Sequence, residues 1–120
     1  MLKPDAFERH LDKVIIEEIE KNNFKIVKTW RGIAPRKKLE NNYIEFKNKS
    51  FFKEWMDFLQ SGDVQGMVIE GDNAIEKFRK FTFQIRDKLA PGDKRKNLLH
   101  SSDCAEAAKR ELENFFDKNV

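Results

Sequence analysis

The sequence contains only one cysteine, and this scarcity excludes an internal disulfide, because Cys104 has no second cysteine to pair with. A chain without internal disulfides suits a reducing compartment. The sequence also lacks an apolar run of the roughly 20 residues that cross a membrane, and its N-terminus lacks the apolar segment of a secretory signal. Internal repeats and low-complexity tracts are absent as well. We therefore expect a cytoplasmic protein that makes no membrane contact.

The remaining composition is that of a globular domain. Hydrophobic residues make up 39% of the chain and charged residues 38%, with eleven phenylalanines available for a core. A chain of 120 residues can form such a core unaided, so we expect a single domain over residues 1–120. Basic residues exceed acidic ones by 24 to 21, and the net charge of +3 suits a polyphosphate ligand. A nucleic-acid-binding protein ranks last, since that interpretation rests on a pI of about 9.0 alone.

Apolar periodicity predicts both helices and strands. Five segments repeat apolar side chains every three or four residues, as helices do. Two others have the properties of strands, and in the first of them Phe24, Ile26 and Trp30 share one parity, with Lys28 as a polar exception. We expect helices at 7–22, 36–47, 51–59, 74–83 and 104–117, strands at 24–33 and 64–70, a loop at 84–96 and a very short strand at 97–99. This order predicts an α+β sandwich.

The stretch from Asn97 to Asp103 holds His100, one of only two histidines. An unperturbed imidazole is largely neutral at physiological pH and can act as a nucleophile. Asp103 can cap the following helix, and Glu106 completes an acidic variant of the capping box. Because a helix N-terminus carries exposed N–H groups and a positive dipole end, His100 is expected where a phosphate binds favourably. Taken alone, the same pattern also fits a packing or surface histidine.

Short motifs distributed over the whole chain carry a more specific signal. In order they are Lys3-Pro4-Asp5-Ala6, Tyr43 followed by Phe51-Phe52, Ser61-Gly62, Met67-Val68-Ile69-Glu70-Gly71, Asn73-Ala74 followed by Arg79, and Asn97-Leu98-Leu99-His100-Ser101-Ser102-Asp103. Together with Glu111 in the last predicted helix, this succession resembles the nucleoside diphosphate kinase family, whose phosphorylated histidine lies in a similar segment. No single motif is specific, but their shared order and spacing are difficult to obtain by chance.

The resemblance implies a fold and a reaction. The fold would be a ferredoxin-like βαββαβ sandwich with a four-stranded antiparallel sheet covered by helices. The reaction would be a ping-pong transfer of the γ-phosphate of a nucleoside triphosphate to a nucleoside diphosphate, with His100 as the phosphorylated intermediate. Mg²⁺ would be the cofactor, bridging the nucleotide phosphates without a metal site made of protein side chains, and the protein would be a homo-oligomer.

The resemblance also implies roles for individual residues. Catalytic roles would fall to His100, Lys3, Tyr43, Glu111 and Ser102, and nucleotide-binding roles to Lys3, Phe51, Arg79, Arg95 and Asn97. Phosphoryl transfer requires mainly positioning and charge stabilisation, which accounts for these residue types. Taken singly, each of them is also common as a packing residue or a solvated helix charge.

Two groups of these residues would act on different parts of the reaction. Lys3 and Tyr43 would hold the moving phosphoryl group, while Glu111, supported by Ser102, would accept a hydrogen bond from one ring nitrogen of His100 so that the other can attack. The nucleotide would be bound through its phosphates by Arg79 and Arg95, through its sugar by Asn97, and through its base by stacking on Phe51.

The sequence departs from the family pattern in several places. Residues 91–97 compress a longer loop, and reading Pro-Gly-Asp-Lys-Arg against P-G-T-I-R matches Arg95 to the family's loop arginine. Ile85 falls where the family has a phosphate-contacting threonine, Ser101 replaces a glycine, and Asn42 stands where a histidine is common. Only Met1 and Leu2 remain of the first strand, so either that strand is short or the natural chain begins upstream.

These departures keep a second function open. A non-catalytic nucleotide-binding or scaffolding module could have the same fold with a shortened loop and a clipped first strand. Such a module would be expected to lose the histidine first, and His100 is present. An active phosphotransferase is therefore the leading interpretation.

Overall fold

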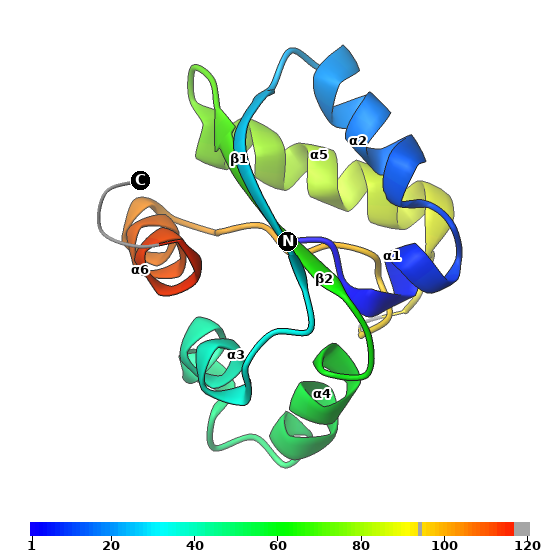
Figure 1. Ribbon diagram of the computed structural model, residues 1–120. Helices are drawn as coiled ribbons and strands as arrows, with labels where there is room; N and C mark the ends of the chain where they lie inside the picture. Colours follow the sequence, from blue (N-terminus) through cyan, green and yellow to red (C-terminus); the bar gives the residue numbers. More distant parts are fainter. Residues whose placement is uncertain (94, 117–120) are drawn as a thin grey trace.

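The computed structural model describes residues 1–93 and 95–116. Each strand follows and precedes helices along the chain, as Figure 1 shows. The elements are α1 (Pro4–Glu8), α2 (Asp12–Lys21), β1 (Lys25–Gly32), α3 (Arg36–Asn42), the 3₁₀ turn η1 (Ile44–Phe46), α4 (Phe52–Leu59), β2 (Val64–Glu70), α5 (Ala74–Leu89) and α6 (Ala105–Phe115). The predicted α+β class is confirmed.

The sheet among the described residues is antiparallel throughout. Strands β1 and β2 pair over their whole length, from Lys25 opposite Glu70 to Gly32 opposite Val64. Leu2 extends this sheet by one bridge to Gln65 and a second to Leu99. The four strand positions of the expected sheet are therefore present, but the first and last are reduced to the bridge residues Leu2 and Leu99. The first is short because Pro4 begins α1 directly after Lys3.

A β-bulge in β1 corrects one sequence prediction. The register shifts between Ile26 and Lys28, which leaves Val27 without a partner in β2. Ile26 and Trp30 consequently lie on opposite faces of the sheet, although their parity predicts one face. Ile26 packs in the cluster with α2 and α5, whereas Trp30 packs in the cluster with α3, α4 and α6.

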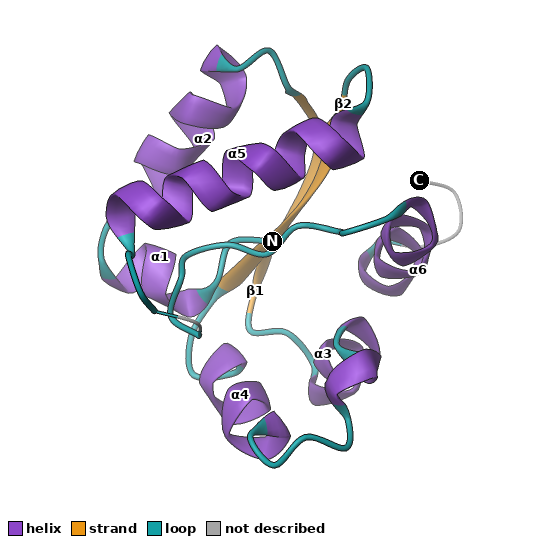
Figure 2. Cartoon of the chain, turned by 180° about the vertical axis from the view of Figure 1, so that it is seen from behind, coloured by secondary structure: helices purple, strands orange, loops and turns teal. Residues whose placement is uncertain are grey.

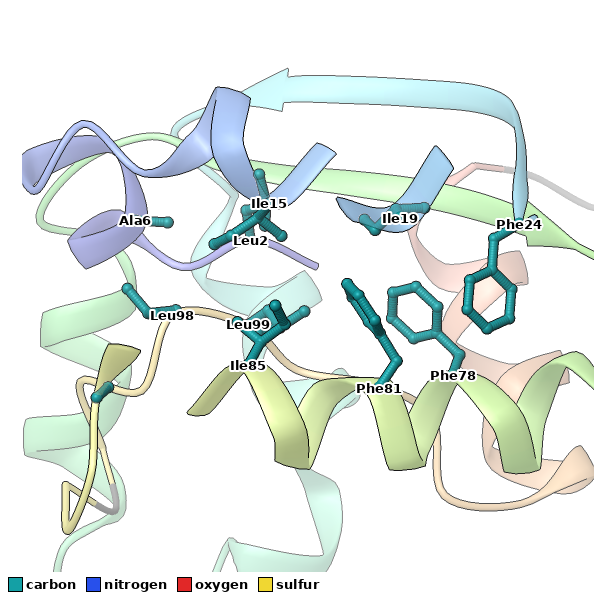
Figure 3. Packing of buried hydrophobic residues seen from close by; sticks show 11 residues of the cluster. Leu2, Ala6, Ile15, Ile19, Phe24, Phe78, Phe81, Ile85, Leu98 and Leu99 are labelled. Carbon is teal, nitrogen blue, oxygen red and sulfur yellow. The ribbon is translucent and has the colours of Figure 1, made fainter. Parts of the chain in front are cut away.

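The two faces of the sheet thus carry two separate cores. One core lies between the sheet, α2 and α5, where Phe24 contacts Phe78 and Phe81 edge to face; Figure 3 shows both rings rising from α5. The other core includes Leu39 and Met56 and lies under α3 and α4. Figure 2 shows α6 beside α3 on this second face.

The predicted helix over 7–22 is wrong as one helix and is two in the structure. Helix α1 ends at Glu8 and α2 begins at Asp12, with His10 between them in the left-handed region at φ 56°. The Arg9 side chain donates a hydrogen bond to the Leu89 carbonyl oxygen at 2.7 Å, which ties this break to the end of α5.

The predicted loop over 84–96 is also wrong in its first half. Helix α5 continues to Leu89, because Ile85 and Leu89 extend the apolar stripe of Phe78 and Phe81 into the same core. Asp87 and Lys88 between them are exposed. This extension places Arg86 on the helix.

Smaller differences concern the remaining helices. The predicted helix 36–47 is divided into α3 and η1, with Tyr43 between them. Cys104 caps α6, and its Sγ accepts a hydrogen bond from the Ala107 N–H at 3.4 Å. Residue 117 of the predicted last helix lies outside the described residues. Within the described ranges, no helix is long and apolar enough to span a membrane.

Candidate active site

A cavity of about 520 Å³ lies among α4, α5, α6 and the N-terminal segment, and we call it the site cavity. It is the place where most of the predicted site residues meet. Those that line it are Lys3, Tyr43, Arg79, Asn97, His100 and Glu111. They come from distant parts of the sequence, so the cavity exists only in the folded chain.

The backbone holds His100 from two sides. Its N–H donates to the Met1 carbonyl oxygen at 2.8 Å, and the Met1 amino group donates to the His100 carbonyl oxygen at 2.7 Å. The Arg86 side chain donates to the carbonyl oxygen of Leu99 at 2.6 Å. His100 is therefore fixed at the end of the short pairing between Leu2 and Leu99.

The preceding turn is fixed by a buried carboxylate. Leu98 has a φ of 78°, in the left-handed region that a leucine rarely adopts. Its N–H donates to the Asp5 carboxylate at 2.9 Å, and the Asp5 side chain is almost fully buried. Asp5 of the Lys3-Pro4-Asp5-Ala6 motif thus holds the turn that leads to His100, while burial raises the pKa of its carboxyl.

Glu111 orients the His100 ring. The Nε2 atom of His100 forms a hydrogen bond with Oε1 of Glu111, whose residue is only 8% exposed. Burial lowers the pKa of His100, and the Glu111 carboxylate opposes part of that effect. The net result is an imidazole that is neutral at physiological pH. With Nε2 engaged, Nδ1 is the ring nitrogen left for chemistry.

Lys3 is a buried cation at the other end of the site. Its side chain is 2% exposed, and Nζ donates to Oδ1 of Asn97 at 2.7 Å and to the Arg95 carbonyl oxygen at 3.3 Å. The Trp55 ring lies 5.6 Å from Nζ. Burial lowers the pKa of Lys3 to about 7. An anion in the site cavity would favour the charged form of this amine.

Tyr43 packs between the histidine and the second core. Its ring centroid is 5.1 Å from that of His100 and 4.6 Å from that of Trp55. Its hydroxyl is buried and has no hydrogen-bond partner among the described residues, and burial raises its pKa. A buried hydroxyl without a partner is costly, so a ligand oxygen in the site cavity would be favourable there.

The remaining predicted residues are less closely grouped. Arg79 lines the site cavity and donates to the Asp103 carbonyl oxygen at 3.4 Å. Phe51 and Arg95 lie beyond the cavity lining and contact each other, with the guanidinium 5.7 Å from the ring centroid. Ser102 lines a separate apolar cavity of about 130 Å³ behind Glu111. Among the described residues, no hydrogen bond joins it to Glu111.

Sequence reasoning missed three residues that shape the site. Asp5 holds the turn before His100, Trp55 packs on Tyr43 and Lys3, and Arg86 reaches the residue before His100. Asp5 was visible as part of a motif. Arg86 follows Arg79 by seven residues, which is two helical turns, but this spacing has meaning only if α5 extends beyond residue 83.

The acidic residues of the site do not form a metal cage. Among residues 1–93 and 95–116, no group of three or more His, Cys, Asp or Glu side chains could hold a metal ion. Lys3, Arg79 and Arg86 contribute cationic groups to the site cavity, whose lining also includes Arg110 and the carboxylates of Glu45, Asp103, Glu106 and Glu111. Glu45 pairs with Arg110, and Glu111 bonds His100. The other cations can therefore hold an anion, and a divalent cation would fit beside them only if an anionic ligand carried it.

Comparison with known proteins assigns this arrangement to a family. The family model described as nucleoside diphosphate kinase matches residues 1–120. The chain belongs to the nucleoside diphosphate kinase family. It is 41% identical to the nucleoside diphosphate kinase of Acanthamoeba polyphaga mimivirus, with 97% of this chain and 89% of that protein covered. It is 40% identical to that of Saccharolobus solfataricus, with 99% and 93% covered.

Solved structures of nucleoside diphosphate kinases share the fold. The apo enzyme of Encephalitozoon cuniculi superposes with a TM-score of 0.90 at 26% identity, over 99% of this chain and 87% of that one. The Halobacterium salinarum enzyme in complex with CDP gives a TM-score of 0.84 at 30% identity, over 98% and 85%. The ferredoxin-like fold predicted from the motifs is thereby confirmed.

Proposed function

We propose that this protein transfers the γ-phosphate of a nucleoside triphosphate to a nucleoside diphosphate through a phosphohistidine on His100. The observation that carries the proposal is the neutral imidazole of His100, oriented by Glu111, in a cavity that Lys3, Arg79 and Arg86 also line. Family membership supports the reaction, and the geometry supports His100 as the carrier.

The first half-reaction follows from the orientation of the ring. The Nδ1 lone pair attacks the γ-phosphorus, a P–N bond forms, and the bond from phosphorus to the bridging oxygen breaks with its electron pair leaving on the nucleoside diphosphate. The phosphorylated ring keeps its Nε2 proton and so becomes positively charged, and the Glu111 carboxylate bonded to Nε2 balances that charge. In the second half-reaction a terminal oxygen of the acceptor diphosphate attacks the same phosphorus, and Nδ1 leaves.

The surrounding residues act by position and charge. Lys3 and the Tyr43 hydroxyl would contact the moving phosphoryl group, since both lie in the cavity wall with His100. Arg79 would bind the remaining phosphates at the cavity entrance, and Asn97, now bonded to Lys3, would bind the sugar hydroxyl. The support of Glu111 by Ser102 stays a prediction.

The nucleoside end would lie toward Phe51 and Arg95. Stacking of the base on Phe51 would tolerate different bases, because every base presents a π face. Arg95 lies over that ring and also pairs with Glu54 at 3.2 Å, so its nucleotide contact would be made from the Phe51 side.

Mg²⁺ is the cofactor we infer for this reaction. It would be held by the phosphate oxygens of the bound nucleotide, because the described side chains supply no cage of their own. When bound, it neutralises phosphate charge during transfer.

The decisive test is acid-labile labelling of the enzyme with ATP carrying ³²P in the γ-phosphate, in the presence of Mg²⁺. Label that a nucleoside diphosphate discharges, and that His100→Ala lacks, is the expected result. The matched control is His10→Asn at the only other histidine, because asparagine tolerates the left-handed backbone found there. Nucleotide binding by folded protein without any label would overturn the enzyme and favour a non-catalytic binding module.

We also infer a homo-oligomer. Strand β1 pairs with β2 alone among the described residues, and it exposes Val27, which is 44% exposed at the bulge. Ile33, just after the strand, is 61% exposed. A free strand edge with apolar side chains is suited to contact with another copy of the chain. The cytoplasmic location expected from the sequence stays a prediction.

A further inference from the structure

Two arginines on α5 flank one aromatic ring in the wall of the site cavity. Arg79 and Arg86 are separated by two helical turns, so they lie on the same side of the helix. The guanidinium carbon of each is 5.6 Å from the ring centroid of Phe83, which lies between them. All three residues line the site cavity with His100.

Arg86 is the member of this pair tied most directly to the histidine. Its Nη2 donates to the carbonyl oxygen of Leu99, the residue before His100, at 2.6 Å. Arg79 instead donates to the carbonyl oxygen of Asp103, three residues after His100, at 3.4 Å. Arg86 therefore holds the segment that leads into His100, and Arg79 contacts the segment between His100 and α6.

Arg86 also has donor capacity that the protein does not use. Its Nε is buried and has no hydrogen-bond partner among the described residues, and the Tyr43 hydroxyl in the same cavity wall is in the same condition. An arginine can only donate hydrogen bonds. The partner that would satisfy Nε is consequently an acceptor, and a phosphate oxygen has the charge and geometry that a guanidinium binds best.

The pairing of charges around the cavity points the same way. Arg86 has no carboxylate within ion-pair distance among the described residues, whereas Arg95 pairs with Glu54 and Arg110 pairs with Glu45. Of the carboxylates that line the cavity, Glu45 is thus taken up by Arg110, and Glu111 bonds His100. Burial and the charge of Arg79 both lower the pKa of Arg86, so an anion beside it would be stabilising.

We propose that Arg86 binds the phosphoryl group that is transferred to His100, taking over a contact that the isoleucine at position 85 cannot make. The inference rests on the proposed function and adds a residue to it. Arg79 binds the phosphates that stay with the nucleotide, and Arg86 binds the terminal one. The extension of α5 through Leu89 is what brings this arginine into the cavity.

The experiment compares nucleotides that differ only in the terminal phosphate. Dissociation constants for ADP and for the non-hydrolysable triphosphate adenosine 5′-(β,γ-imido)triphosphate, both with Mg²⁺, are measured for wild type and Arg86→Gln from the change in intrinsic tryptophan fluorescence on titration, to which Trp30 and Trp55 both contribute. The matched control is Arg9→Gln. Like Arg86, Arg9 donates a hydrogen bond to a backbone carbonyl oxygen, that of Leu89, but it lies outside the site cavity. We expect Arg86→Gln to raise the dissociation constant of the triphosphate about tenfold or more, because a charge-assisted hydrogen bond is lost. The dissociation constant of ADP should change by less than about twofold.

A purely structural role for Arg86 would give a different pattern. If Arg86 only holds the Leu99 carbonyl, Arg86→Gln should weaken the binding of ADP and of the triphosphate equally, and this result would overturn the proposal. Unchanged affinities for both nucleotides would overturn it as well. If the Arg86→Gln variant does not fold, Arg86→Lys serves as the second variant. Its loss of triphosphate affinity relative to ADP affinity should be smaller, because lysine keeps the charge. If wild type binds both nucleotides but forms no phosphoenzyme, the proposed transfer fails while a selective loss still supports Arg86 as the terminal-phosphate ligand.

Discussion

At His100 two opposing effects act on one ring. Burial disfavours the charged imidazolium, and the hydrogen bond from Nε2 to Glu111 favours it. Burial is the larger effect, so the histidine keeps its nucleophilic lone pair at neutral pH. At Lys3 burial acts in the same direction and lowers the pKa to about 7, whereas the phosphate contact that we propose for Lys3 requires the charged form.

These two groups predict a bell-shaped pH dependence of kcat/KM. His100 must be neutral, and its pKa lies below its ordinary value of 6.5, so activity should fall only when the pH drops below that value. Lys3 must be charged, so activity should also fall as the pH rises above about 7. Steady-state rates measured from about pH 5 to about pH 10 at constant ionic strength test both limbs. An acid limb centred above 6.5 would contradict the burial argument for His100.

Removal of the Glu111 carboxylate should change the orientation and the pKa of the His100 ring without unfolding the protein. Glu111→Ala removes a charge-assisted hydrogen bond worth about 1.5 to 3 kcal/mol, so phosphoenzyme formation should slow about tenfold or more. The pKa of His100 should also fall further, because its only favourable carboxylate is lost. Single-turnover labelling and NMR titration of His100 measure the two effects. Glu113→Ala, an exposed position on the same helix, is the control and should change neither.

At the scale of elements, α5 decides what the site contains. The helix would end near residue 83 if its polar residues determined its length, and it continues to Leu89 because Ile85 and Leu89 reach the core. Tertiary packing therefore overrides local polarity, as is common for amphipathic helices. Local pattern fails in strand β1 as well, because one bulge places Trp30 on the opposite face of the sheet from Ile26.

The extended α5 predicts a specific loss of stability. Ile85 is 6% exposed, so Ile85→Ala should lower the free energy of unfolding by about 2 to 5 kcal/mol, through lost burial and the cavity left behind. Its exposed neighbour is the control, and Gln84→Ala should change stability by less than about 0.5 kcal/mol. Urea unfolding at one fixed protein concentration measures both. A small loss for Ile85→Ala would mean that residues 84–89 behave as a loop in solution.

At the scale of the whole molecule, hydrogen bonds between the N-terminal segment and the segment around His100 hold the site together. Met1 and His100 are 99 residues apart and exchange two backbone hydrogen bonds. Lys3 and Asn97 are joined by a bond between their side chains across 94 residues. Because few local contacts hold these groups together, their geometry should be lost when the short pairing of Leu2 breaks.

The free edge of the sheet predicts an assembly larger than one chain. One chain has a mass of 14.3 kDa, and we expect light scattering of the purified protein to give at least twice this value. Val27→Lys, at the exposed bulge of β1, should shift the protein toward the monomer, because an edge charge opposes strand-to-strand contact. Lys25→Arg on the same strand is the control. A monomer at about 100 μM would exclude a stable oligomer, since specific interfaces hold well below that concentration.

The sequence by itself determined the chemistry and most of the elements. Motif order alone predicts six site residues, and the structure brings all six to one cavity: Lys3, Tyr43, Arg79, Asn97, His100 and Glu111. Strand β2 was predicted with its observed ends, because a continuous run of apolar residues bounded by turn residues depends little on context.

Only the tertiary structure decided which atoms meet. It assigned Nε2 to Glu111 and thereby left Nδ1 for chemistry, it turned residues 84–89 from loop to helix, and it brought Arg86 into the site cavity. None of these follows from local pattern, because each depends on contacts between segments that are far apart in the chain. Hydrogen bonds and burial across the fold, rather than residue spacing, fix the position of a side chain within a site.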